Sequence, residues 1–230
     1  MSTFGLIHGA QHGAWSWDLL IPELTAMGHE PIAMDLPVDD PRAGLEDYVD
    51  VVLESLDGAD DDLVVVGHSM AGMIAPVVAS RRPTRAMAYL CGVVPVPGAT
   101  MAQVLIDEPD LERPLVRQGL SSVNDEGLRV VTAEVGREIY YHDCTTDLAE
   151  WASAQLRPTA DTAVYDPSPL EAFPDVKTAS IVCSDDRVVS PDWSRRVARQ
   201  RLGISCIELP GGHAPMLSRP KDLARILDEI

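Results

Sequence analysis

Lysine is almost absent from this sequence, because Lys177 and Lys221 are the only two lysines among 230 residues. Lys and Arg together number 18 against 36 acidic residues, so the formal net charge at pH 7 is −18. A chain of this charge repels phosphate backbones and anionic lipid headgroups. We therefore expect no nucleic-acid partner and no membrane partner, and the charge also disfavours polyanionic substrates.

Long hydrophobic runs are missing as well. No stretch approaches the roughly 18 uninterrupted apolar residues that a membrane helix needs. The opening MSTFGLIHGAQHG lacks the basic head and long apolar run of a signal peptide. We expect a soluble protein of the cytoplasm.

The cysteines do not form any C-x-x-C pair. The four thiols, which lie far apart in the chain, are Cys91, Cys144, Cys183 and Cys206, and three of them fall in apolar stretches typical of strands. Buried, reduced thiols are the simplest interpretation and fit a cytosolic protein. The sequence therefore predicts no cysteine-based metal site.

What the chain does contain is a regular alternation of short β-branched runs with amphipathic ones. The runs predict strands at 3–7, 30–35, 63–67, 85–94, 179–184 and 204–209. Helices are predicted at 15–27, 45–56, 70–81, 191–202 and 221–230. Apolar strands separated by helices favour an α/β fold with a mostly parallel sheet of about six strands, flanked by helices on both faces. Ligands of such sheets bind beyond the carboxyl ends of the strands.

The segment 95–174 breaks this alternation. It shows no convincing strand, opens with PVPGA, closes with PSPLEAFP and holds helix-like pieces at 101–105 and 146–155. About 80 residues is too long for an ordinary loop. We expect a helical cap, or lid, over a core formed by 1–94 and 175–230, all in one compact unit. A second, independent domain is the alternative.

The stretch LVVVGHSMAG, at 63–72, resembles the G-x-S-x-G turn in which a strand passes sharply into a helix and exposes a serine nucleophile. Ala71 stands at the second glycine position and Gly72 follows it, so the small residues that the turn needs are present. Pro76 lies inside the predicted helix and presses on the carbonyl of Gly72, which gives that glycine a second use. The alternative is a buried strand end with no chemistry. Ser69 is the candidate nucleophile.

A base and an acid are expected after the last two strands, in the order Ser, Asp, His. Only His142 and His213 follow Ser69, and PGGHAPML places His213 on a glycine-rich turn after the last strand, whereas His142 lies in the irregular insertion. His213 is the predicted base. The stretch CSDDR offers both Asp185 and Asp186 as the acid, and the pattern alone leaves the choice open.

Two backbone amides would complete the site as an oxyanion hole. The early loop HGAQHG supplies the Ala10 amide, and helix entry after the serine supplies that of Met70. His8 and His12 have the H-x-x-x-H spacing of metal ligands, but no third ligand accompanies them. Hydrogen bonds within the loop are their predicted role, and no metal or nucleotide cofactor is implied.

Taken together, the motifs resemble the α/β-hydrolase superfamily, and within it the branch of plant methyl-ester esterases and hydroxynitrile lyases with their bacterial esterase relatives. The resemblance covers most of the chain and is carried by LIHGAQHGAWSW, VVVGHSMAGMIAP, YYHDCTTDLAEWASAQLRP, CSDDRVVSP and GGHAPMLSRP. The block H-G-A-x-H-G-A-W is its most specific part. Family spacing from Cys183 to Pro191 selects Asp186 over Asp185, which implies a catalytic triad of Ser69, Asp186 and His213.

The same resemblance separates two chemistries. The lyases carry threonine where this chain has Gly9, and lysine where it has Ala214, so both positions resemble the esterases. The sequence predicts a carboxylesterase acting on a small, fairly apolar ester through an acyl-enzyme. A lyase or other tailoring enzyme with the same triad, and a ligand-binding protein on a hydrolase scaffold, are the alternatives.

The substrate pocket is expected between core and cap. Its candidate lining residues are apolar or aromatic: Trp15, Met70, Met101, Tyr140, Tyr141 and Trp151. Packing in the core is an equal alternative for each of them. A small-molecule ester is the expected partner, and a homodimer stays open.

Overall fold

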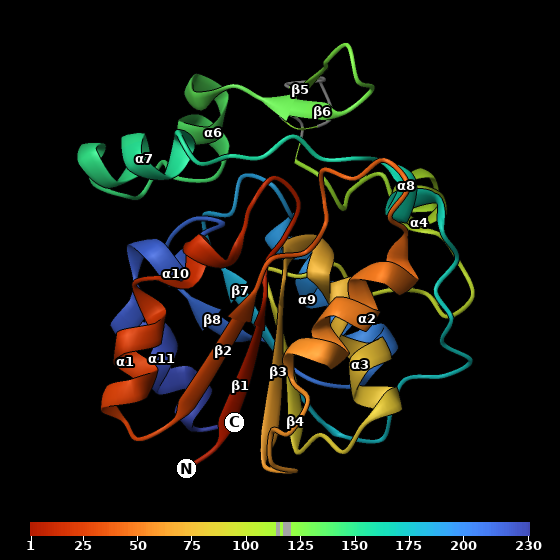
Figure 1. The fold of residues 1–230 in the computed structure, drawn as a ribbon, viewed down its shortest axis with the longest axis vertical. Coiled ribbons are helices and arrows are strands. Elements are labelled where there is room, and N and C mark those ends of the chain that lie inside the picture. Colours follow the sequence, from red (N-terminus) through yellow and green to blue (C-terminus); the bar gives the residue numbers. More distant parts are fainter. Residues whose placement is uncertain (114–115, 117–120) are drawn as a thin grey trace.

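The computed structural model describes residues 1–113, 116 and 121–230. Its centre is a six-stranded parallel sheet of order β2-β1-β3-β4-β7-β8 (Figure 1). The strands are β1 (Thr3–Ile7), β2 (Glu30–Met34), β3 (Leu63–His68), β4 (Ala86–Leu90), β7 (Lys177–Cys183) and β8 (Ile207–Leu209). The predicted α/β fold and the six core strands are confirmed, and their ends shift by a few residues.

Helices cover both faces of the sheet. One face carries α1 (Leu20–Ala26), α10 (Pro215–Ser218) and α11 (Pro220–Asp228), and the other carries α2 (Leu45–Ser55), α3 (Ala75–Arg81) and α9 (Pro191–Val197) (Figure 1). Strand β3 shows why, since Val64 and Val66 join one buried cluster while Leu63 and Val65 join the other. A strand that is buried on both faces must be apolar throughout.

Two of the predicted helices are each divided into a 3₁₀ helix and a shorter α-helix, and a third, 191–202, is divided into α9 and a π-helical turn, η3 (Ala198–Leu202). The segment after β3 begins as a 3₁₀ helix, η2 (Ser69–Met73), and α3 starts only at Ala75 with Pro76 in its first turn. Proline is tolerated there because its missing amide would have no helical partner. The predicted 15–27 helix likewise becomes a 3₁₀ turn, Ala14–Trp17, followed by α1.

The segment between β4 and β7, residues 95–174, lies over the carboxyl ends of the strands and is called the cap segment below (Figure 1). It contains α4 (Met101–Asp107), β5 (Ser121–Val123), β6 (Arg129–Val131), α6 (Ala133–Ile139), α7 (Thr146–Ser153) and α8 (Thr162–Tyr165). The antiparallel pair β5–β6 was not predicted, because three-residue strands are too short to show a period of two. The cap segment is therefore not purely helical. Its residues 114–115 and 117–120 lie outside the described part.

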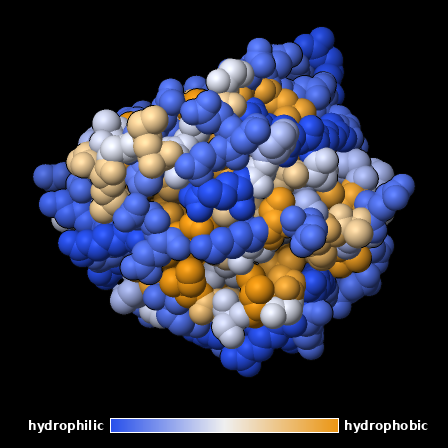
Figure 2. Space-filling view, turned by 90° about the horizontal axis from the view of Figure 1, so that it is seen from below, coloured by the Kyte–Doolittle hydropathy of each residue, from blue (hydrophilic) through white to orange (hydrophobic). Residues whose placement is uncertain are grey.

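The face that carries the chain termini lies at the opposite end of the sheet. Seen from that side, the surface is mainly hydrophilic, with hydrophobic residues in smaller groups between the polar ones (Figure 2). Of the helices in the described ranges, none has the length and apolar character needed to cross a bilayer.

Candidate active site

Ser69 occupies the sharp turn between β3 and η2. Its φ of +55° is in the left-handed region, which is rare for a residue with a side chain and marks functional turns. The turn brings backbone so close that a Cβ on Gly67 would lie 2.5 Å from the Ala71 carbonyl oxygen. The glycine two residues before the serine is therefore a steric necessity, as the motif predicts.

Gly72 has a different role from the predicted one. A side chain there would collide with the backbone of Val93, in the loop after β4. The Val93 amide donates to the Ser69 carbonyl at 2.9 Å, so this loop is held against the turn. Because Pro76 lies in the first turn of α3 and not inside a continuous helix, packing against the β4 loop explains the glycine.

His213 lies in the loop after β8 and is completely buried. Its Nδ1 donates to Asp186 Oδ2 at 2.8 Å. The other carboxylate oxygen of Asp186 accepts from the amides of Val188 (2.8 Å) and Val189 (3.1 Å). The carboxylate is thus fixed on both oxygens, and its imidazole partner must carry the proton on Nδ1, which leaves Nε2 as the acceptor.

Asp185, the other candidate acid, points away from this pair. It is exposed, its side chain accepts from Ser184 Oγ at 2.9 Å, and its carbonyl oxygen accepts from His142 Nε2 at 3.1 Å. Between the two adjacent aspartates, the structure therefore brings only Asp186 to His213.

The other ring nitrogen of His213, Nε2, is buried and makes no hydrogen bond to any described residue, so it is not bonded to Ser69 either. The two residues are nevertheless linked through His68, the residue before the serine. His68 Nε2 donates to the His213 carbonyl oxygen at 2.8 Å, and the two rings are 4.7 Å apart between centroids. The free Nε2 lone pair is thus held beside the turn that carries Ser69.

The loop after β1 is held by its two histidines. His8 Nδ1 donates to the Gly9 carbonyl at 2.8 Å, and its Nε2 accepts from the Leu36 amide at 2.9 Å. Burial lowers the pKa of His8 to about 4. This histidine is neutral at ordinary pH, and both of its ring nitrogens are already engaged.

His12 is fixed in the same way. Its Nδ1 donates to the Ala10 carbonyl at 2.7 Å, and its Nε2 accepts from the Tyr141 hydroxyl at 2.9 Å. Burial lowers the pKa of His12 to about 3. Hydrogen bonding within the loop, and not metal binding, accounts for both histidines of the H-x-x-x-H pair.

Gly9 allows this loop to touch the serine. A Cβ on Gly9 would lie 2.7 Å from Ser69 Cβ, so only a glycine backbone fits. Ala10 follows it and, like Met70, lines the cavity onto which Ser69 opens. The Ala10 amide donates to no other residue of the described chain, so it is available to a ligand.

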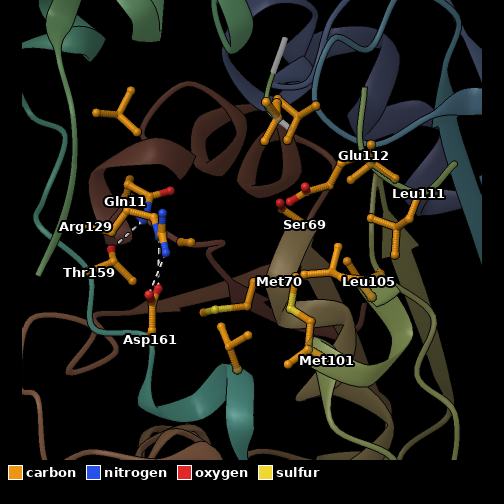
Figure 3. A pocket seen from close by; sticks show the side chains of 18 of the residues that line it. Gln11, Ser69, Met70, Met101, Leu105, Leu111, Glu112, Arg129, Thr159 and Asp161 are labelled. Carbon is orange, nitrogen blue, oxygen red and sulfur yellow. Dashed lines mark hydrogen bonds and ion pairs between the residues drawn. The ribbon is translucent and has the colours of Figure 1, made fainter. Parts of the chain in front are cut away.

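Ser69 opens onto a cavity of about 520 Å³ between the strand ends and the cap segment. One wall is mainly apolar and includes Met70, Met101, Leu105 and Leu111, with the carboxylate of Glu112 beside Ser69, whereas the opposite wall carries the polar side chains of Gln11, Arg129, Thr159 and Asp161 (Figure 3). Arg129 and Asp161 pair through two hydrogen bonds of 3.0 and 2.6 Å. None of the four polar residues was singled out by the sequence, because they are separated in the chain and share no motif.

Of the aromatic and methionine residues predicted to line a pocket, Met70, Met101 and Tyr140 do line this cavity. Trp15, Tyr141 and Trp151 lie outside it. Trp15 stacks on His12 with centroids 5.6 Å apart, Trp151 meets Trp15 edge to face at 5.5 Å, and Tyr141 bonds His12. These three rings contact His12 or one another and do not line the cavity, so their role is to pack against the early loop.

Four consecutive side chains of the cap segment, Tyr140 to Asp143, each bond a loop of the core. The four bonds join Tyr140 Oη to Gln11 Oε1 (3.0 Å), Tyr141 Oη to His12 Nε2 (2.9 Å), His142 Nε2 to the Asp185 carbonyl (3.1 Å) and the Gly212 amide to Asp143 Oδ2 (2.9 Å). We call this group the cap clamp. It ties together the early loop, the loop of Asp186 and the loop of His213, although sequence reasoning assigned no role to its last two members.

One buried cluster has the composition of a metal site. Ligand atoms of Cys91, Asp186 and His213 lie within 4.8 Å of one another. The carboxylate and the imidazole are, however, already hydrogen-bonded to each other. A hydrogen bond with Cys183 and burial raise the pKa of the Cys91 thiol, which keeps it protonated and a poor ligand. All four cysteines are free; Cys91 and Cys183 are buried as expected, whereas Cys144 and Cys206 are only partly buried.

A parallel sheet of this order, with a serine on a strained strand-to-helix turn and a His–Asp pair after the last strands, defines the α/β-hydrolase class. The chain belongs to the Alpha/beta hydrolase family, whose model matches residues 6–226.

Among curated proteins, the chain is similar to norfluorocurarine synthase 1 of Strychnos nux-vomica, with 27% identity over 99% of this chain and 94% of that protein. It is also 28% identical to methylesterase 7 of Arabidopsis thaliana, over 99% of this chain and 95% of that one. The predicted resemblance to the plant methylesterase branch is therefore confirmed.

Solved structures share the fold over the whole chain. The pyrethroid hydrolase from Sphingobium faniae JZ-2 superposes with a TM-score of 0.84 at 26% identity, covering 99% of this chain and 96% of that one. The relatives thus include a protein named a methylesterase and one named a pyrethroid hydrolase, as well as a protein named a synthase.

Proposed function

We propose that this protein is a serine-dependent carboxylic ester hydrolase that works through an acyl-enzyme. The observation that carries the proposal is the buried 2.8 Å hydrogen bond from His213 Nδ1 to Asp186, beside the strained turn of Ser69. A histidine with its Nδ1 proton held by a carboxylate presents a basic Nε2, which is the form that a general base needs.

In the proposed mechanism, Ser69 Oγ attacks the ester carbonyl while His213 Nε2 accepts the hydroxyl proton. Asp186 holds the imidazole in the required tautomer and stabilises its charged form. The protonated histidine then donates to the departing alcohol. Water repeats the two proton transfers on the acyl-enzyme and releases the acid.

The developing oxyanion is assigned to the amides of Ala10 and Met70. The support is that Gly9 brings the early loop within contact of Ser69 and that the Ala10 amide is otherwise unused. Loss of one such donor costs roughly 3 to 4 kcal/mol of transition-state stabilisation.

Lyase chemistry is disfavoured at the two positions that distinguish it. A side chain on Gly9 would meet Ser69, so the backbone here has no room for the lyase threonine. Ala214, at the lysine position, is fully buried, and an ammonium group there would lose its hydration. These two positions favour ester hydrolysis.

The proposal is tested by covalent labelling and product analysis on the intact protein. A fluorophosphonate is expected to modify Ser69, located by peptide mass spectrometry, and p-nitrophenyl and methyl esters of short acyl chains are expected to release free acid. A folded protein whose Ser69 stays unlabelled would refute the proposed function.

The acid is tested by a matched pair of aspartate variants. Asp186→Asn is expected to lower kcat for ester hydrolysis by about 10³- to 10⁴-fold, because the amide no longer fixes the Nδ1–H tautomer. Asp185→Asn, one residue away and exposed, is expected to leave kcat within about twofold of wild type. Equal losses in both variants, measured with p-nitrophenyl acetate, would contradict the assignment.

Asp143 of the cap clamp is expected to act as a positioning residue. Asp143→Ala removes the acceptor for the Gly212 amide, next to His213, and should lower kcat about ten- to hundredfold with KM almost unchanged. Asp143→Asn keeps an acceptor oxygen and should restore most of the rate. The exposed Asp147→Ala is the control, and a loss in KM alone would argue against positioning.

A second candidate is a tailoring reaction at the same three residues, which the 27% identical synthase favours. Product analysis separates the two. Acid release from several esters supports hydrolysis, whereas a labelled Ser69 with no turnover of any short-chain ester supports the tailoring reaction.

A further inference from the structure

Gln11 follows the proposed oxyanion residue Ala10 and occupies the variable position of the H-G-A-x-H-G-A-W block. Its φ of +60° is in the left-handed region, where a residue with a side chain costs about 1–3 kcal/mol unless its surroundings impose that conformation. The cap segment imposes it: the Gln11 amide donates to Thr159 Oγ1 at 2.9 Å and its carbonyl accepts from the Arg157 amide at 2.8 Å. A strained residue held this firmly is a candidate for a role in the site.

The side-chain oxygen of Gln11 is also occupied. The Tyr140 hydroxyl donates to Oε1 at 3.0 Å, and burial raises the pKa of Tyr140, so this hydroxyl stays a donor at any assay pH. With the amide in this orientation, Oε1 meets Tyr140 and Nε2 is left for another partner. Three of the four polar atoms of Gln11 are therefore paired with the cap segment.

The fourth polar atom is the amide nitrogen Nε2. It makes no hydrogen bond to any residue that the structure describes, while Gln11 lines the cavity together with Ser69. Figure 3 shows the Gln11 side chain on the cavity wall that faces Ser69. Gln11 as a whole is only 6% exposed, but its amide nitrogen is not fully enclosed, so an acceptor on a ligand in the cavity can take the place of water at this donor.

Two other polar side chains of this wall are already engaged within the protein. Thr159 Oγ1 already accepts the Gln11 amide, and Asp161 is engaged by the guanidinium of Arg129 through two bonds. A neutral amide donor also suits a neutral oxygen, and the wall opposite is mainly apolar apart from the carboxylate of Glu112. The cavity thus pairs a donor beside the reaction centre with an apolar compartment.

We propose that Gln11 determines specificity by donating from Nε2 to a second acceptor oxygen of the substrate, an ether or carbonyl oxygen close to the scissile ester. The inference rests on the proposed ester hydrolysis and narrows its substrate class to apolar esters that are oxygenated near the reacting carbonyl. Without such an oxygen, binding leaves Nε2 unpaired, and a site built to donate a hydrogen bond discriminates against that analogue.

The test uses pairs of esters that differ only by an oxygen in place of a methylene group. p-Nitrophenyl methoxyacetate and p-nitrophenyl butyrate probe the acyl side, and 2-methoxyethyl acetate and butyl acetate probe the alcohol side. For each pair the ratio of kcat/KM values, oxygenated over plain, is measured in wild type and variants. Comparing ratios between proteins cancels the intrinsic reactivity of each ester.

Gln11→Glu keeps an acceptor for Tyr140 and removes the donor, and Gln11→Leu removes both. We expect the ratio for at least one pair to fall about tenfold in both variants. Gln103→Leu, on the exposed face of α4, is the matched control and should leave both ratios unchanged. Thermal unfolding of each variant shows whether it is folded, and Gln11→Glu keeps the proposal testable if Gln11→Leu is not.

The outcomes separate the two levels of the proposal. Ratios that stay at the wild-type value for both pairs in folded Gln11→Glu, while Ser69 is labelled by fluorophosphonate, overturn the role of Gln11 alone. Absence of labelling in wild type overturns the hydrolase proposal and the specificity proposal with it.

Discussion

Replacement of Ser69 by alanine is expected to lower kcat for ester hydrolysis by about 10⁵- to 10⁶-fold, since nucleophile and base act as one unit. His213→Ala is expected to lose about the same amount. The double variant should lose no more than either single one, because each change alone already disables the unit. Sensitive detection of p-nitrophenolate release measures all three rates.

The same serine variant should fold like wild type. Alanine keeps the Cβ and therefore the same backbone strain at a φ of +55°. Ser55→Ala, on α2 away from the cavity, is the matched control and should retain full activity and full fluorophosphonate labelling. A Ser69→Ala protein that still hydrolyses esters at more than a hundredth of the wild-type rate would refute the nucleophile assignment.

We expect the protein to lose stability on acidification at pH values well above those at which exposed carboxylates titrate. His8, His12 and His68 are buried as neutral imidazoles, and burial lowers the pKa of His8 to about 4, of His12 to about 3 and of His68 well below 6.5. In the unfolded chain each returns to a pKa of about 6.5. Below that pH the unfolded state binds protons that the folded state does not.

The contribution of these three histidines to the free energy of unfolding is therefore at its full value above about pH 6.5 and falls as the pH drops toward 4. Each histidine contributes a slope of up to about 1.4 kcal/mol per pH unit, so the three together reach about 4 kcal/mol per unit. Urea unfolding at pH 7.5, 6.5, 5.5 and 5.0 measures this slope. Screening salt should be present, because approach to the pI of about 4.5 relieves the repulsion of the −18 charge and acts in the opposite direction.

A free energy of unfolding that stays constant between pH 6.5 and 5.0 would show that the three imidazoles are not buried in neutral form.

The parts of the site that the sequence predicted are those with local signals. Ser69 follows an aliphatic strand and is flanked by the small residues that its turn requires, so the ten residues 63–72 were enough to predict its position. The choice between Asp185 and Asp186 was different, because two adjacent carboxylates look alike in sequence. The turn after β7 separates them, since it aims two backbone amides at Asp186 and leaves Asp185 exposed.

The cavity wall and the cap clamp could not be predicted in this way. The bonds of Tyr140 and Tyr141 join residues 129 positions apart, and no period or spacing records such contacts. Trp15 and Trp151 were expected in the pocket on hydrophobicity alone, but a ring that supports a loop and a ring that lines a cavity have the same signature in sequence.

The cap clamp also limits how a substrate can reach Ser69. If that part of the cap segment moved away from the core, the hydrogen bonds that hold the early loop and the His213 loop would break. The proposed site can therefore not be correctly arranged while the cap segment is open at the clamp. Ile106 of α4 and Tyr165 of α8 line the same cavity and are 71% and 66% exposed. A substrate that passes between these two helices leaves the cap clamp intact, and we expect substrates of the proposed esterase to enter there.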